Sequence, residues 1–317
     1  MSIYEKYKSR RSSWGIDVLG SVICEIELSN GVCGAGISIG GEPACYLIEK
    51  HYSRFLIGQD PMNVEYIWDC MYRSSMNYGR KGITIQTISS VDLALWDCIG
   101  KLLRQPVYKL LGGQTKGSLP CYATCYNPAA CKKLGFVGAK FTLPYGPGML
   151  TIQYYTTYLI NLIVACIYLQ HRCICYGRIA DGDIGMRKNI ERVKSVRDSV
   201  GAEYPLMIDC YMALTTTYTI ELLHQLKPYN IKWVEEFLPP DSYSGYTEVK
   251  QKNPSSTLLT TGEHEYTRWG FKQLLEGKCA DLLQPGMNIN HNIQLYVYEV
   301  LTNNTYTYIY IYIYIHP

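Results

Sequence analysis

The sequence predicts an α/β protein in which a small α+β domain precedes an incomplete barrel of alternating strands and helices. An alternating hairpin followed by helical patterns fills residues 1–115, which is typical of a mixed α+β domain. From residue 116 to 285, short apolar runs that indicate buried parallel strands alternate with helical patterns. At 317 residues, the chain is long enough for these two domains.

The first domain begins with a predicted β-hairpin. Residues 18–28 and 32–39 alternate between apolar and polar side chains, and Ser-Asn-Gly at 29–31 is a hairpin turn signal. Helical patterns then cover residues 45–56, 64–75 and 83–103, and a short helix within 106–113 ends at a glycine pair.

The second domain shows six candidate strands. They are expected over 120–126 and 136–143, in three runs that lead to Asp209, Glu235 and Glu263, and over 280–284. Helical patterns cover 184–200, 218–227 and 268–276. The alternation stops after the sixth strand, so we expect a barrel that lacks its last two or three units.

The three acidic residues are the strongest functional signal. Asp209, Glu235 and Glu263 follow one another at intervals of 26 and 28 residues, close to the roughly 30 residues of a βαβ unit. Their carboxylates would converge at the mouth of a barrel, where active sites lie. They could be ordinary acids paired with Lys or Arg, which is the commoner case for a single residue. Three at matching positions favour a hard divalent cation such as Mg²⁺.

Composition narrows the class of protein. A hydrophobic content of 47% allows a buried core, while a net charge of +3 without a basic stripe argues against nucleic acid as a partner. The 13 cysteines show no zinc-site spacing, and no signal peptide begins at Met1. We therefore expect buried thiols in a cytoplasmic protein.

Two further motifs carry a family resemblance. Ser90-Val-Asp-Leu-Ala-Leu-Trp-Asp97, Pro106-Val-Tyr-Lys-Leu-Leu-Gly-Gly113 and the three acids resemble the mandelate racemase/muconate lactonizing enzyme branch of the enolase superfamily. A finer resemblance, to the L-rhamnonate dehydratases, rests on segments such as Trp233-Val-Glu-Glu-Phe-Leu-Pro-Pro240 and Thr260-Thr-Gly-Glu-His264. It covers residues 1–147 and 180–285.

The resemblance implies a lid domain over a (β/α)7β barrel, with Mg²⁺ held by Asp209, Glu235 and Glu263. In that family the metal binds the carboxylate of a sugar acid and stabilises the enediolate that forms when the C2 proton is removed. Loss of the 3-hydroxyl then gives a 2-keto-3-deoxy acid. Arg11 matches a substrate-contacting arginine of the lid, although a solvated basic cluster explains it equally well. No membrane partner is expected, and the complete protein is expected to be a homo-oligomer.

The sequence departs from this family at the catalytic base. Lys140 stands where relatives place the first Lys of Lys-x-Lys, but Thr142 fills the second place. The rhamnonate group uses a His after strand seven and an Asp after strand six; Gly286 occupies the Asp position, and no Pro-His-Gly-Ser-Ser segment follows. The start also resembles an internal point of the family. With no catalytic residue of this kind present, we expect no turnover by the chain as written; the alternative is a non-catalytic relative that binds only metal or a partner.

Two segments look foreign to the family. Residues 148–179 and 286–317 both begin Gly-Met and together hold 12 of the 30 tyrosines, and both can be read as translated intron. A membrane span within 141–170 is the rival interpretation of the first, but several polar residues weaken it and it would interrupt the barrel. The Tyr-Ile alternation of the second could instead form an aggregation-prone strand.

Overall fold

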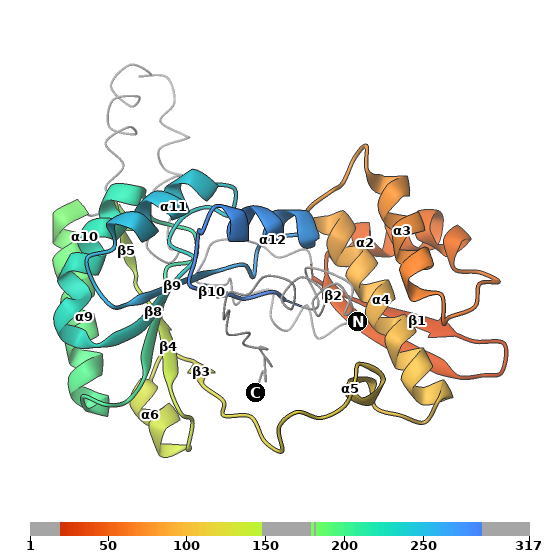
Figure 1. The fold of residues 1–317 in the computed structure, drawn as a ribbon, viewed down its shortest axis with the longest axis horizontal. Helices are drawn as coiled ribbons and strands as arrows, with labels where there is room; N and C mark the ends of the chain where they lie inside the picture. The colour runs from red at the N-terminus through yellow and green to blue at the C-terminus, as the bar shows by residue number, and fades with distance from the viewer. Residues whose placement is uncertain (1–19, 148–178, 181, 287–317) are drawn as a thin grey trace, which may run out of the picture. The chain divides into compact units, whose positions relative to one another are not determined.

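The computed structural model describes residues 20–147, 179–180 and 182–286 (Figure 1). Contacts group the described chain into two units. The hairpin unit contains residues 20–119, 261–276 and 282–286, and the sheet unit contains the described residues of 120–260 together with 277–281.

The hairpin unit begins with the predicted β-hairpin, which is confirmed. β1 (Ser21–Glu27) pairs antiparallel with β2 (Cys33–Ile39), and the Asn30 side chain accepts a hydrogen bond from the Val32 N–H at 3.1 Å. Along both strands the side chains alternate between exposed and buried, as the period of two requires.

The helices of this unit follow the predicted order. They are α2 (Gly41–Leu47), α3 (Val64–Ser75), α4 (Ile83–Leu102), α5 (Val107–Leu110) and α12 (Thr267–Glu276). The helix predicted over 45–56 begins earlier, because Pro43 is tolerated in a first turn, where its missing N–H needs no partner. It continues as a π-helical turn, Ile48–Tyr52, and a 3-10 turn, Ser53–Phe55.

Helix α4 lies directly on β2 because two strand glycines leave room for it. A Cβ added to Gly36 would lie 2.0 Å from the Ser90 carbonyl oxygen, and one added to Gly34 would lie 2.3 Å from that of Ala94. The helix backbone therefore occupies the space that strand side chains would otherwise fill.

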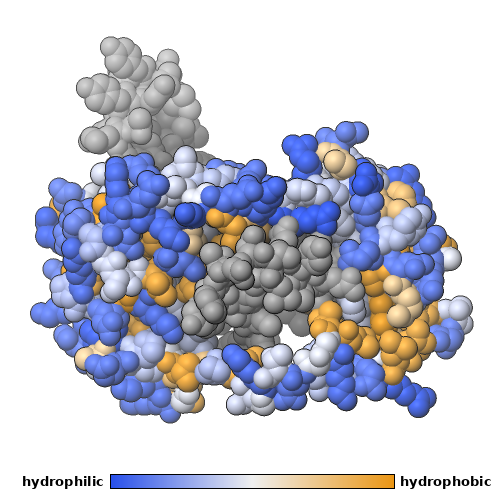
Figure 2. Space-filling model, viewed as in Figure 1, coloured by the Kyte–Doolittle hydropathy of each residue, from blue (hydrophilic) through white to orange (hydrophobic). Residues whose placement is uncertain are grey.

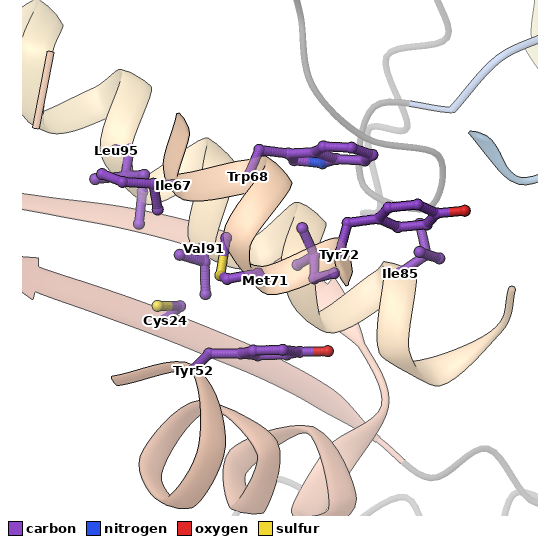
Figure 3. Close-up of a cluster of buried hydrophobic side chains, with 11 residues drawn as sticks. Cys24, Tyr52, Ile67, Trp68, Met71, Tyr72, Ile85, Val91 and Leu95 are labelled. Carbon is purple, nitrogen blue, oxygen red and sulfur yellow. The ribbon is translucent and has the colours of Figure 1, made fainter. Parts of the chain in front are cut away.

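The core of the hairpin unit is apolar. Figure 3 shows Ile67 and Met71 of α3 and Val91 and Leu95 of α4 close to Cys24 of β1. Met71 and Val91 have no exposed surface. Burial of such side chains is the main favourable contribution to folding.

Helix α12 and the turn before it also belong to the hairpin unit. The ring of Trp269 stacks on Tyr72 with centroids 5.0 Å apart, and Gln86 donates to the Tyr266 hydroxyl at 2.9 Å. Lys81 and Glu265 form an ion pair at 3.0 Å. The sequence pattern predicts a helix at this point of the chain, as the structure has it, but the contact of this helix with α3 joins residues far apart in the sequence, which local periodicity does not reveal.

Among the described residues, the main sheet has six strands in the order β10-β9-β8-β7-β4-β3, and the strand pairs from β3 to β9 are parallel. The strands are β3 (Ala123–Thr124), β4 (Ala139–Thr142), β7 (Leu206–Asp209), β8 (Ile231–Glu235), β9 (Leu258–Thr261) and β10 (Leu282–Leu283). The protein therefore has an α/β fold with a parallel sheet, as predicted. The first strand is much shorter than the predicted 120–126.

In the described part of the sheet unit there are four helices, and three of them, α9 to α11, line one side of its strands (Figure 1). They are α6 (Pro128–Lys133), α9 (Gly182–Val200), α10 (Thr216–Leu226), which a 3-10 turn extends over Lys227–Tyr229, and α11 (Tyr243–Lys252). They connect successive parallel strands, as crossover helices do.

A small strand pair lies outside the main sheet. β5 (Tyr145–Gly146) runs parallel to β6 (Ile179–Ala180), so two chain positions separated by the foreign-looking segment are hydrogen-bonded neighbours. Residues 148–178 and 287–317 themselves lie outside the described residues.

The visible surface carries both apolar and hydrophilic side chains. Figure 2 shows apolar side chains set among hydrophilic ones on the visible face, and Ile23 and Ile37 of the hairpin are 65% and 55% exposed. Within the described part of the chain, no helix combines the length and the apolar character that a membrane crossing requires.

Candidate metal centre

Asp209 is the last residue of β7, a strand whose four residues are all buried. Its Oδ1 accepts a hydrogen bond from the Tyr211 N–H at 3.0 Å. The backbone then turns sharply, because Tyr211 and Met212 have φ values of 46° and 60°. Non-glycine residues with positive φ cluster at functional sites, where surrounding contacts hold the strain.

Glu235 occupies the corresponding position on the next strand. It ends β8 opposite Asp209 in the parallel register and has no exposed surface. Its Oε2 accepts a hydrogen bond from Trp233 Nε1 at 3.3 Å. The next residue, Glu236, again has a positive φ, 42°, and donates its N–H to the Thr260 carbonyl.

Glu263 differs from the sequence prediction in its place. It stands two residues beyond the end of β9 and not on the strand, and its side chain is 15% exposed. Gly262 makes the turn with a φ of 128°, and a Cβ there would lie 3.1 Å from the Gln284 nitrogen. Glycine is needed at this position, since other residues rarely adopt this conformation.

The three carboxylates converge as predicted. One carboxylate oxygen from each of Asp209, Glu235 and Glu263 lies within 4.8 Å of the others. A second group with the same spacing combines Glu236, Glu263 and His264. An all-oxygen set of two buried carboxylates and one half-buried carboxylate fits a hard divalent cation of the Mg²⁺ type.

Lys140 enters this group from β4, on the other side of β7. Its side chain is fully buried, and Nζ lies 2.9 Å from Asp209 Oδ2 and 2.5 Å from Glu235 Oε1. The sequence predicts that Lys140 lies on this strand, but it does not predict a role for Lys140 in the metal site. The available signal was a lysine inside an otherwise apolar buried strand, a rare position for that residue type.

The cluster is strongly negative around its fixed lysine. Burial raises the pKa of the Cys210 thiol well above its usual value, and the charges of Asp209 and Glu235 raise it further. Three ionised carboxylates and one ammonium carry a formal charge of −2. A divalent cation would neutralise that charge, so the residues present fit the metal.

Two other positions singled out in the sequence are Arg11 and Gly286. Arg11 lies outside the described residues. Gly286 is described and stands where the resemblance places a carboxylate.

Comparison with known proteins adds the following. The family model of the mandelate racemase / muconate lactonizing enzyme N-terminal domain matches residues 17–112, and the enolase C-terminal domain-like model matches 173–289. An L-rhamnonate dehydratase of Saccharopolyspora erythraea is 42% identical over 288 residues, which cover 91% of this chain and 66% of that protein.

Solved structures agree with the sequence match. The crystal structure of L-rhamnonate dehydratase from Gibberella zeae matches with a TM-score of 0.78 and 42% identity, and covers 90% of this chain and 65% of that one. A structure of rhamnonate dehydratase from the same organism, complexed with Mg, gives a TM-score of 0.79 and 41% identity, with 92% and 64% covered. The chain thus spans slightly less than two thirds of the length of these relatives.

Proposed function

Because this chain belongs to the mandelate racemase/muconate lactonizing enzyme branch of the enolase superfamily, we propose that it is a Mg²⁺-dependent sugar-acid dehydratase, a hydro-lyase. The observation that carries the proposal is the convergence of the Asp209, Glu235 and Glu263 carboxylates. The identity to L-rhamnonate dehydratases supports an aldonate of the L-rhamnonate type as substrate. The product would be a 2-keto-3-deoxy acid.

The described residues supply the cation-binding half of this chemistry. Mg²⁺ held by the three carboxylates would supply a Lewis acid for the carboxylate of the sugar acid. Asp209 and Glu235 are buried and fixed by hydrogen bonds from Tyr211 and Trp233. Glu263 is more open to solvent, so it marks the side from which a substrate would approach.

The Pro-His-Gly-Ser-Ser segment from which the resemblance expects the base of the proton-transfer half does not occur in the given sequence. Arg11 is proposed to contact the sugar acid. The resemblance places an Asp after Pro285, where this chain has Gly286, and that Asp would orient a catalytic histidine. This difference favours a second candidate function, a relative that binds the cation without turnover.

A cytoplasmic location and a homo-oligomeric complete protein belong to the same proposal. The location is supported by the cysteines, because Cys24, Cys98, Cys131 and Cys210 are buried thiols without a disulfide, as expected in a reducing compartment.

Two measurements test the proposal and separate its two forms. Calorimetric titration with Mg²⁺ should show binding to this chain, and Asp209→Asn should abolish it, while Asp198→Asn on the exposed face of α9 should not. Absence of Mg²⁺ binding to the unaltered chain would overturn both forms.

Turnover is the second measurement. A panel of aldonates is incubated with the protein and Mg²⁺, and the 2-keto product is detected as its semicarbazone. Formation of product from an L-rhamnonate-type acid identifies the dehydratase. Mg²⁺ binding without product from any acid of the panel identifies the non-catalytic relative.

A further inference from the structure

Lys140 is a buried charge that contacts two carboxylates of the metal centre. Its ammonium group lies between Asp209 Oδ2 and Glu235 Oε1, at 2.9 Å and 2.5 Å, and the side chain has no exposed surface. A lysine is rarely buried to this extent, because moving an ammonium ion out of water costs several kcal/mol (order of magnitude) unless it is well paired.

The Lys140 ammonium group occupies a place between two carboxylates that favours a positive charge. Each carboxylate uses one oxygen for Lys140 and accepts a hydrogen bond on the other, Asp209 from the Tyr211 N–H and Glu235 from Trp233 Nε1. Without the ammonium, two buried carboxylates would face each other at the ends of neighbouring strands, a pair of like charges that is strongly unfavourable.

We propose that Lys140 is the internal counter-ion of this site, which holds the Asp209 and Glu235 carboxylates together before a divalent cation binds and weakens the binding of that cation. The inference rests on the proposed Mg²⁺ site and goes beyond it by assigning a positioning residue that sets its affinity.

Two opposing effects of Lys140 decide whether removal of its charge strengthens or weakens cation binding. Its positive charge repels a divalent cation placed on the same carboxylates, and its hydrogen bonds orient those carboxylates. Orientation does not depend on Lys140 alone, because the β7–β8 register and the Tyr211 and Trp233 hydrogen bonds fix the two side chains independently. The repulsion acts over a few ångströms in a buried site, where electrostatic interactions are strong. Removal of the charge should therefore tighten cation binding by at least about tenfold.

The test compares the full-length protein with Lys140→Met, which keeps the length of the side chain and removes its charge. Mg²⁺ affinity is measured by calorimetry, and the melting temperature is measured with and without Mg²⁺. Lys140→Met should melt below the unaltered protein in the absence of Mg²⁺, bind Mg²⁺ at least about tenfold more tightly, and gain more in melting temperature when Mg²⁺ is added.

Two variants separate this role from a structural one. Lys140→Gln keeps a hydrogen-bond donor without the charge and should behave like Lys140→Met, and it replaces that variant if the methionine protein does not fold. Lys250→Met is the control. It removes a partly buried lysine of the sheet unit, which pairs with Asp281 at 3.1 Å. It should lower the melting temperature equally with and without Mg²⁺, with no change in affinity.

The outcomes are distinct. If the unaltered protein binds Mg²⁺ and neither Lys140 variant binds it more tightly, the inference is overturned and the proposed function stands. If neither the unaltered protein nor a Lys140 variant binds Mg²⁺, both fail.

Discussion

The core of the hairpin unit and the innermost residues of the metal centre are equally buried and chemically opposite. Met71 and Val91 in the core are 0% exposed, and so are Lys140 and Glu235 in the metal centre. The core holds almost only apolar side chains (Figure 3), whereas the centre holds two acids and a lysine in direct contact.

The difference separates what stabilises this protein from what it does. Apolar burial contributes roughly 25 cal/mol per Å² to folding. A buried ion pair contributes little on balance, because desolvation offsets the attraction, and hydrophobic replacements are often neutral or stabilising. A group of charges kept at such a position therefore points to ligand binding, and the following changes test that division.

The largest stability effect is expected in the core. Met71→Ala removes a fully buried side chain and should lower the free energy of unfolding by about 2–5 kcal/mol, through lost burial and the cavity left behind. Denaturant unfolding measures it. Met62→Ala is the control, because Met62 is 51% exposed, and it should cost less than about 0.5 kcal/mol. Equal losses in the two variants would contradict the assigned core.

Loss of one carboxylate charge from the metal centre should lower Mg²⁺ affinity and not stability. Glu235→Gln keeps the shape of the side chain but removes one charge, and Lys140 retains Asp209 as a partner. Mg²⁺ affinity, measured by calorimetry, should fall at least about 100-fold. The melting temperature without Mg²⁺ should not fall, since the remaining buried pair is neutral. Glu248→Gln, an exposed site on α11, should change neither quantity. A large loss of stability in Glu235→Gln would show that the metal centre contributes to folding as the apolar core does.

The contact between α4 and β2 should show an intermediate effect. Gly36→Ala places a methyl group 2.0 Å from the Ser90 carbonyl oxygen, so the helix must shift. We expect a loss of about 1–3 kcal/mol in the free energy of unfolding and an unchanged Mg²⁺ affinity. Gly117→Ala is the matched control, because the new methyl group would lie 3.9 Å from the Gln114 side-chain amide, an ordinary van der Waals distance. A neutral Gly36→Ala would mean that the helix and strand are not this close in solution.

An exposed ion pair should matter least among the substitutions. Lys252 and Glu248 are 2.7 Å apart on α11, but their side chains are 60% and 47% exposed. Lys252→Ala should change the free energy of unfolding by less than about 0.5 kcal/mol at moderate salt, because solvent screens the attraction. A clearly larger loss of the free energy of unfolding would contradict the view that the exposed Lys252–Glu248 pair contributes little to stability.

Removal of residues 148–179 should leave both regions unchanged. Gly146 and Ala180 are neighbours in the β5–β6 pair, which lies outside the main sheet, so the two ends left by the deletion are close in space. Because β5 and β6 are parallel and the deletion removes Ile179, a direct link from Pro147 to Ala180 replaces this strand pair but leaves the six-stranded sheet in place. The shortened protein should keep its melting temperature and Mg²⁺ affinity. An unfolded product would show that the segment is part of the fold. Sequencing the mature transcript across codons 147–180 tests independently whether the segment is translated intron.

Local sequence patterns predicted the elements well and their partners less well. The hairpin and the helix over 64–75 were correct because periodicity and turn residues specify them within a few residues. The strands leading to Asp209 and Glu235 were also correct, and their spacing predicted that the carboxylates converge. Glu263 converges with them although it lies beyond its strand, which a strand-end pattern could not distinguish.

By itself, the sequence determined the α/β class, the family and the three carboxylates, since each of these is written in residue types at short or regular spacing. Only the tertiary structure decided that Lys140 lies between Asp209 and Glu235, that α12 packs with α3, and that Gly146 and Ala180 are neighbours. The physical reason is that these contacts join positions far apart in the chain, 95 residues for Lys140 and Glu235. Strand order and packing bring such positions together, and no local pattern specifies them.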